Sequence, residues 1–126
     1  MCIRDRKYYG KQHEDTLNAA YNLAITLRRL GQFEEARALL RESISVAQRV
    51  RGPCDVRTLK MRWDYANALY MDPAATLDDL REAVTTLEET ERTARRVLGG
   101  AHPLIVDIEG YLRNARAALR ARNTSV

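Results

Sequence analysis

The chain has 126 residues, of which 45% are hydrophobic and 30% are charged, and its formal net charge is +4. This length suits a single domain, and the low counts of glycine (6) and proline (3) exclude a disordered chain and a turn-rich β fold. Cys2 and Cys54 are the only cysteines, so we expect no disulfide framework and a reducing, cytoplasmic setting. The sequence contains no apolar run of membrane-spanning length, so we expect no membrane partner.

Apolar residues recur at spacings of three and four over residues 16–30, which predicts a first helix that Asp15 or Thr16 can cap. Gly31 follows its arginine-rich end, where cations are favourable and glycine can adopt a positive φ. A second helical pattern runs from Phe33 to Val50. Because the connection between them is so short, the two helices must fold back on each other as an antiparallel hairpin.

Three further helical patterns follow, over Val56–Tyr70, Leu77–Leu98 and Pro103–Arg122. Thr76, followed three residues later by Asp79, predicts a variant capping box at the start of the fourth helix. Pro103 is compatible with the first turn of the fifth helix. We expect residues 123–126 to fray.

The helical patterns repeat. Thr16-Leu17 returns as Thr58-Leu59 after 42 residues, and Phe33–Ala36 ("FEEA") returns as Leu80–Ala83 ("LREA") after 47 residues. A unit of about 42 residues that contains two antiparallel helices is a solenoid repeat. We therefore divide a single domain, 1–126, into repeat one (about 9–50), repeat two (about 51–98) and a capping half-repeat (about 99–122).

The spacing of the larger and smaller apolar residues around Gly31 resembles the tetratricopeptide repeat, at Leu23, Ala24, Leu27, Phe33, Ala36 and Leu40. The segments from Gly10 to Leu17 ("GKQHEDTL") and from Gly99 to Val106 ("GGAHPLIV") look like the linkers of the kinesin light chain-like subclass. The resemblance implies an all-α, right-handed superhelical solenoid of antiparallel helix pairs, with about five helices and a C-terminal capping helix. It also implies that Leu23, Ala24, Leu27, Phe33 and Ala36 hold the first hairpin together, and that His13 and His102 stabilise linker turns.

The same resemblance bears on the two ends of the chain. Glu109 and Arg113 stand where repeat one has apolar or small residues, as the polar outer face of a terminal cap requires. The chain is then the C-terminal part of a longer array. The opening "MCIRDR" resembles translated adapter sequence, which leaves open whether Met1–Arg6 belong to the natural chain.

Tetratricopeptide arrays are non-enzymatic scaffolds or adaptors, and the first helices of their pairs line a concave groove that binds an extended peptide of a partner. Asparagines there could hydrogen-bond a peptide backbone, and Arg28 and Lys60 could pair with acidic side chains. Tyr21 and Trp63 are predicted to be neighbouring aromatic surfaces, with packing between the repeats as the alternative. The predicted groove positions are Asn18, Tyr21, Asn22, Ile25, Arg28, Lys60, Trp63, Asp64, Asn67 and Tyr70.

Other functions find less support in the sequence. A carboxylate clamp is disfavoured, because Asp64 and Tyr111 occupy the positions equivalent to Asn22. We find no metal-spaced cluster and no phosphate-binding loop, and expect no cofactor, metal or catalytic residue. One alternative is a structural or self-associating spacer that associates through an exposed N-terminal solenoid end. A less favoured one is a nucleic-acid binder using Arg113, Arg116 and Arg120, although acidic residues interrupt that basic surface.

Overall fold

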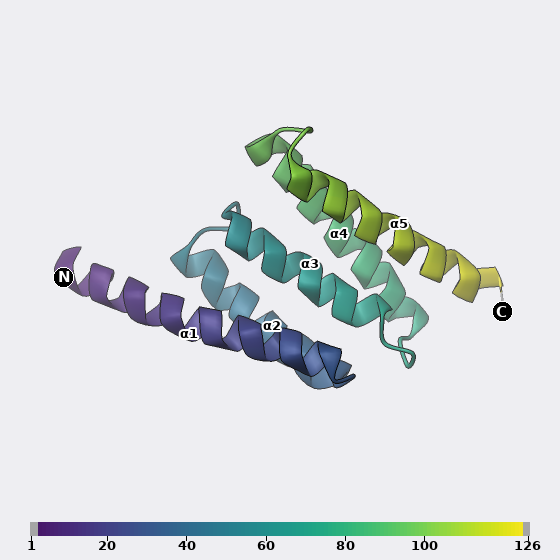
Figure 1. The fold of residues 1–126 in the computed structure, drawn as a ribbon, viewed down its shortest axis with the longest axis horizontal. Coiled ribbons are helices and arrows are strands. Elements are labelled where there is room, and N and C mark those ends of the chain that lie inside the picture. The colour runs from purple at the N-terminus through teal and green to yellow at the C-terminus, as the bar shows by residue number, and fades with distance from the viewer. Residues whose placement is uncertain (1–2, 125–126) are drawn as a thin grey trace.

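The structure is a computed structural model that describes the backbone of residues 3–124 and the side chains of residues 15–123. The described chain forms five α-helices and no strand (Figure 1). This arrangement confirms the predicted all-α solenoid of antiparallel helix pairs. The helices are α1 (Ile3–Arg29), α2 (Phe33–Val50), α3 (Val56–Tyr70), α4 (Leu77–Leu98) and α5 (Pro103–Thr124).

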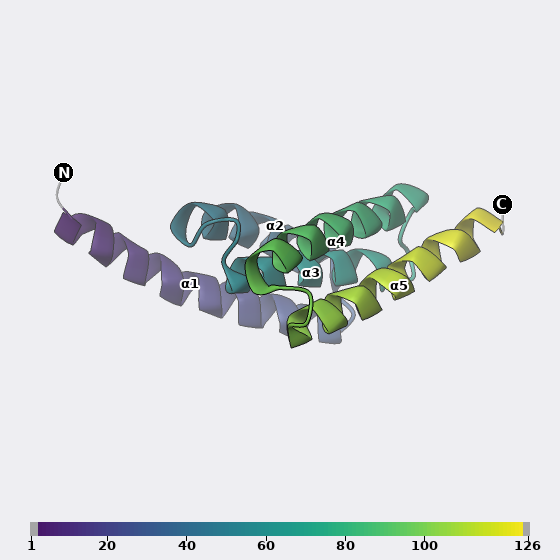
Figure 2. The ribbon, with the colours of Figure 1, turned by 90° about the horizontal axis from the view of Figure 1, so that it is seen from above.

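The helices form two layers, with α1, α3 and α5 in one and α2 and α4 in the other (Figure 2). Each helix packs mainly against its neighbours in sequence, and α3 also contacts α1 and α5 within its own layer. In such a stack each helix contacts only its close neighbours. A surface shared by several repeats is therefore made by successive helices of one layer. The surface across α1, α3 and α5 is of this kind.

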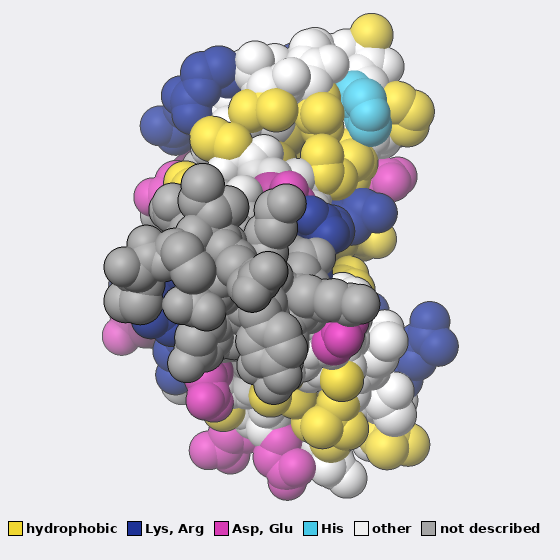
Figure 3. Space-filling view, turned by 90° about the vertical axis from the view of Figure 1, so that its left-hand side faces the viewer, with side chains coloured by type: hydrophobic (Ala, Val, Ile, Leu, Met, Phe, Trp, Pro, Cys, Tyr) yellow, Lys and Arg dark blue, Asp and Glu magenta, His cyan; other side chains and the backbone are white. Residues whose placement is uncertain are grey.

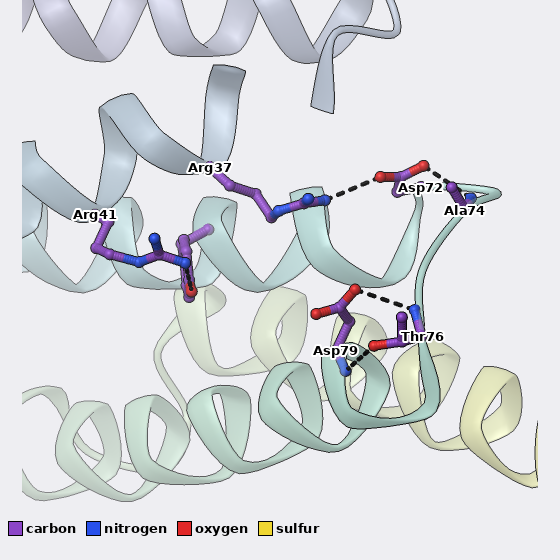
Figure 4. Close-up of polar contacts among 7 residues, drawn as sticks. Arg37, Arg41, Asp72, Ala74, Thr76 and Asp79 are labelled. Atoms are coloured by element: carbon purple, nitrogen blue, oxygen red, sulfur yellow. Dashed lines mark hydrogen bonds and ion pairs between the residues drawn. The ribbon is translucent and has the colours of Figure 1, made fainter. Parts of the chain in front are cut away.

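The helix ends follow the signals predicted from the sequence. Gly31 has a φ of +84°, which lets the chain leave α1 and enter α2 within three residues. Asp55 caps α3 by accepting a hydrogen bond from the backbone N–H of Arg57. At α4 the predicted capping box is confirmed: the Thr76 hydroxyl accepts from the Asp79 N–H, and the Asp79 carboxylate accepts from the Thr76 N–H (Figure 4).

The predicted start of α1 is wrong. The helix begins at Ile3 and passes through Gly10 and His13, so the segment from Gly10 to Leu17 is not a linker and neither Asp15 nor Thr16 caps the helix. A glycine inside a helix costs only about 1 kcal/mol, and good helix formers such as Lys11 and its neighbours offset that cost. At the other end, α5 extends to Thr124, so residues 123 and 124 are helical. Residues 125–126, like Met1 and Cys2 of the opening segment, lie outside the described residues.

Small and branched residues fill the core between the two layers. Ala24, Ala36, Ala66 and Ala83 are fully buried, which lets paired helices approach closely. Larger side chains fill the remaining space, notably Leu40, Leu59, Leu87, Ile105 and Ile108. The expectation that Leu23 holds the first hairpin together is wrong, because its side chain is 52% exposed on the outside of α1.

Polar side chains tie repeat one to repeat two on the α2 side. Arg37 of α2 forms a 2.9 Å ion pair with Asp72, which follows α3, and both side chains are largely buried (Figure 4). Arg41 donates to the Tyr65 hydroxyl at 3.0 Å, and Tyr65 in turn donates to Glu82 of α4 at 2.6 Å. The Tyr65 side chain therefore links three successive helices.

Candidate functional site

The candidate site is the outer surface of the layer made by α1, α3 and α5. Figure 3 looks along the helices from the end at which α1 begins, and the molecule is hollowed on the side of this layer. Basic side chains border the hollow in that view. The predicted groove positions on α1 and α3 fall into three groups by exposure. Asn18, Asn22 and Lys60 are exposed; Tyr21, Ile25, Arg28 and Tyr70 are half-buried; and Trp63, Asp64 and Asn67 are buried.

A hydrogen bond between Tyr21 of α1 and Asp64 of α3 crosses the middle of this surface, with the Tyr21 hydroxyl donating to the carboxylate. Burial raises the pKa of Asp64, while the Tyr21 hydroxyl and the positive charge of Arg28 act in the opposite direction. Burial and the adjacent Asp64 carboxylate also raise the pKa of the Tyr21 hydroxyl. Asp64 therefore places a carboxylate of the protein itself at the position where a carboxylate clamp would need a second asparagine.

The positive charge of Arg28 lowers the pKa of both members of this pair. Its Nη1 lies 3.5 Å from the sulfur of Met71, which is a weak acceptor, and its buried Nε has no hydrogen-bond partner among the described residues. The Arg28 residue as a whole is half-buried. Asn67 is only 2% exposed, and its side-chain oxygen is likewise without a described partner. These two groups have hydrogen-bonding capacity that the described side chains do not use.

Trp63 contributes to the core. It is 9% exposed, and its ring centroid lies 5.7 Å from that of Tyr111 on α5, at an interplanar angle of 49°. Tyr21 packs against the same core cluster but forms its polar contact with Asp64. Among the described residues, the aromatic ring that contacts Trp63 is thus that of Tyr111 on α5, the next helix of the same layer.

The two remaining groove residues differ in their partners. Asn18 accepts a hydrogen bond from Arg51 at 3.1 Å, which ties α1 to the end of α2, whereas Asn22 is exposed. Burial raises the pKa of the Tyr70 hydroxyl, and the neighbouring Asn114 amide of α5 lowers it. Asn22 and Lys60 are consequently the most accessible polar side chains among the predicted positions.

The sequence analysis missed the contribution of α5. Tyr111 contacts Trp63, and Asn114 lies beside Tyr70. The signal was available, because Asp64 and Asn67 shifted by 47 residues give Tyr111 and Asn114. The prediction that α5 is only a cap did not include Tyr111 and Asn114, although the inner side of α5 continues the surface of α1 and α3.

The basic residues of α5 form a different surface, and acidic partners interrupt it. Arg116 pairs with Glu88 and Arg95 pairs with Glu109, both at 2.9 Å. The hollow next to Arg113 is also lined by Glu91 and Glu109. Paired charges of alternating sign do not make the continuous basic track that phosphate backbones require.

The loop before α5 has a structural role. His102 accepts a hydrogen bond from the Leu104 N–H through its Nδ1 at 3.1 Å, as a turn-stabilising histidine does. No cluster of three or more His, Cys, Asp or Glu residues suited to a metal ion occurs in the part of the chain that the structure describes. Within the same residues, no helix is both long and apolar enough to cross a membrane.

Comparison with protein families supports the repeat assignment for the first helix pair. A family model described as the tetratricopeptide repeat matches residues 3–49, which span nearly all of α1 and α2. Neither the curated proteins nor the solved structures gave a match. The family match does not extend to the kinesin light chain-like subclass. Residues 3–49 match a tetratricopeptide repeat, and the five-helix stack of which they form part has the architecture of a tetratricopeptide solenoid.

Proposed function

We propose that this chain is a non-enzymatic interaction scaffold that binds an extended peptide segment of a partner protein across α1, α3 and α5. Tetratricopeptide repeats in general mediate protein–protein interactions. The observation that carries the proposal is the polar surface shared by three helices, with Asn22 and Lys60 accessible beside the Tyr21–Asp64 pair. Side chains from successive repeats on one surface suit a ligand that extends across the repeats.

The chemistry of this surface favours a peptide that carries an acidic side chain. The Nη1 of Arg28 lies 3.5 Å from a methionine sulfur, which is only a weak acceptor, and Lys60 is exposed on α3. A carboxylate of the ligand would receive charge-assisted hydrogen bonds from these cations. Asn22 offers both a donor and acceptors to the peptide backbone.

The kinesin light chain-like subclass is a narrower form of the same proposal. The supporting observation is the loop from Gly99 to Pro103, where Gly99 has a φ of +86° and His102 stabilises the turn before α5. The α1 segment from Gly10 to Leu17, which is helical, does not support it. Membership in that subclass would imply a cargo adaptor.

Selection from a random peptide library, followed by fluorescence anisotropy with the enriched peptides, tests the proposal. The test variant is Asn22→Ala/Lys60→Glu, since both residues are exposed and should leave the core intact. The matched control is Gln48→Ala/Arg92→Glu, which makes the same types of change at exposed positions on α2 and α4. We expect the test variant to weaken binding at least about tenfold and the control to leave it unchanged.

Two results would count against this function. If no peptide is enriched, or if the test and control variants bind the enriched peptides equally well, the surface of α1, α3 and α5 is not the binding site. Enrichment of peptides without acidic residues would contradict only the proposed preference for an acidic side chain in the ligand, and peptide binding at this surface would still stand. A structural or self-associating role is the second candidate, and a separate apolar surface favours it.

A further inference from the structure

An apolar strip runs along the side of α1 that faces away from α3. Leu23 is 52% exposed and Leu30 is 68% exposed, whereas most large apolar side chains of the described chain are covered. Ala19 and Thr26 are exposed at the same helical spacing, so the four residues share one face of the helix. Asn22 borders this strip, since it lies three residues after Ala19 and four residues before Thr26.

A groove between α1 and α2 continues this strip. It has a volume of about 260 Å³, and four of its lining residues are apolar: Leu17, Ala20, Leu39 and Val46. Thr16 and Ser43 also line it, and the charged residues Glu42 and Arg49 complete its lining. Because Ala20 lies three residues before Leu23 on the helix, the groove and the strip form one continuous surface. An apolar surface with charged residues at its margin is typical of a protein contact.

The fold itself shows what such a face packs against. Shifted by 42 residues, Ala19, Leu23 and Thr26 correspond to Met61, Tyr65 and Ala68 of α3. Those three side chains are at most 6% exposed, because α2 packs against α3. Tyr65 also accepts a hydrogen bond from Arg41 of α2. The strip on α1 therefore corresponds to a helix face that, on α3, is covered by another helix.

The C-terminal end of the solenoid does not fit the strip. The side of α5 that corresponds to the α4-facing side of α3 carries Val106, Glu109, Arg113 and Arg116. Head-to-tail stacking of two copies would bury these charges against Leu23 and Leu30, which is costly. A second copy must therefore use another surface.

The strip is complementary to itself. When two α1 helices are placed antiparallel with Leu23 at a twofold axis, the small Ala19 of one copy faces Leu27 of the other. Leu30 then meets Thr16 of the second copy and reaches the groove beside it. Asp15 of one copy also comes close to Arg29 of the other, so charges of opposite sign meet at both ends. The Thr26 hydroxyl already donates to the Asn22 carbonyl at 3.0 Å and can be buried without losing its partner.

We propose that two copies of this chain associate through α1, antiparallel and with Leu23 at the twofold axis. An isologous contact of this kind closes on itself and gives a dimer, not a fibre. The contact leaves the surface across α1, α3 and α5 open, so each dimer would present two such surfaces. The inference does not depend on the proposed peptide binding.

Sedimentation velocity over a series of concentrations tests the association. We expect a concentration-dependent dimer for the unchanged chain, and Leu23→Glu should raise its dissociation constant at least about tenfold, because two charges would meet at the axis. Val106→Glu is the matched control, since this residue is 63% exposed on α5 and its substitution should leave the dimer intact. Circular dichroism of both variants should match that of the parent chain. A monomer at every concentration, or a Leu23→Glu dimer as stable as the parent, overturns the proposal.

Cysteine cross-linking tests the geometry. In a Cys2→Ser/Cys54→Ser background, Leu23→Cys should form a disulfide-linked dimer under mild oxidation, because the two residues meet at the axis. Leu30→Cys should not, since a rise of about 1.5 Å per residue separates the two copies of residue 30 by about 20 Å. Efficient cross-linking through residue 30 and not through residue 23 would contradict the antiparallel arrangement. Dimers that cross-link at neither position would place the contact elsewhere on the molecule.

Discussion

The two outermost helices of the layer formed by α1, α3 and α5 carry different residues on their outer sides. On α1, the side away from α3 exposes Leu23 and Leu30. On α5, the outer side carries Arg113 and Arg116, while Ile108 and Ala115 on the inner side are fully buried against the rest of the array. Both helices have one neighbour in the adjacent layer, so their surroundings are alike and their sequences differ.

The outer side of α5 is therefore charged, whereas the outer side of α1 is apolar. Each repeat of a solenoid buries an apolar face against its neighbour, and the last unit needs a polar outer surface. The outer side of α5 carries charged residues, of which Arg116 and Glu109 form ion pairs with α4. The strip on α1 has the composition of an internal face, which is why we expect it to be covered by another helix.

The largest effect should come from truncating a buried side chain of α5. Ile108→Ala should lower the free energy of unfolding by about 2–4 kcal/mol, because a fully buried side chain of α5 is truncated and a cavity is left. Urea denaturation followed by circular dichroism measures the change. Val106→Ala, two residues earlier but 63% exposed, is the matched control. If both variants lose the same stability, α5 does not close the core as described.

The next effect concerns the tie between α1 and α3. Tyr21→Phe removes the hydroxyl that donates to Asp64 and should cost about 1.5–3 kcal/mol at neutral pH, because a buried carboxylate loses a donor. The cost should depend on pH. Asp64 has a raised pKa in the folded chain, so its contribution to stability is present at acid pH and is lost as the pH rises through that pKa. Removing the donor raises the folded pKa further, so the loss grows with pH.

Urea denaturation at several pH values measures this dependence. We expect Tyr21→Phe to cost less at a pH below about 3.9, the ordinary pKa of an aspartate, than at pH 7. Tyr111→Phe removes a hydroxyl from the same surface without touching the Asp64 bond and serves as the control. A cost that is equal at both pH values would mean that the Tyr21 hydroxyl does not act through the Asp64 carboxylate.

A smaller effect is expected at the start of α4, the helix that packs against α5. Thr76→Ala should cost about 1 kcal/mol, because the Asp79 N–H loses its side-chain acceptor. Thr85→Ala, at an exposed position inside α4, should cost less. Hydrogen exchange would show whether the loss of protection is confined to the first turn of α4. Unchanged protection there would contradict the capping role.

The smallest effects are expected at exposed apolar residues of the two ends. Below the concentration at which the chain dimerises, Leu30→Ala and Val106→Ala should each change the free energy of unfolding by no more than about 0.5 kcal/mol. Above it, only Leu30→Ala should lower the midpoint of thermal unfolding, since association stabilises the folded state. Equal behaviour of the two variants at high concentration would remove the proposed difference between the ends.

Local sequence signals predicted most of this fold. The bounds of α2, α3 and α4 agree with the predicted ranges, because glycine, proline and capping residues mark their ends. The start of α1 was missed, because Gly10 was interpreted as a linker by analogy with Gly52 and Gly99. Those two have positive φ angles, whereas Gly10 lies inside a helix that its neighbours are able to form. A glycine by itself does not distinguish these two situations.

The candidate site was less accessible to sequence reasoning. The repeat offset identified which helices contribute, but it did not predict that Asp64 and Asn67 are buried. Burial of a polar residue depends on what the adjacent repeat supplies, here the Tyr21 hydroxyl for Asp64. Tyr111 and Trp63 similarly meet only because α5 packs beside α3. Which side chains of adjacent repeats contact each other can therefore be determined only from the three-dimensional structure.

The position of Tyr65 has a consequence for how the chain unfolds. In a linear array each unit senses only its neighbours, so one end can open while the other stays folded. The Tyr65 hydroxyl connects Arg41 of α2 to Glu82 of α4, two helices of the same layer that have no backbone contact among those described. Opening α2 would therefore disturb α4 directly. We expect this single phenol to make the two hairpins open together, so that a stack of five helices unfolds as one cooperative unit.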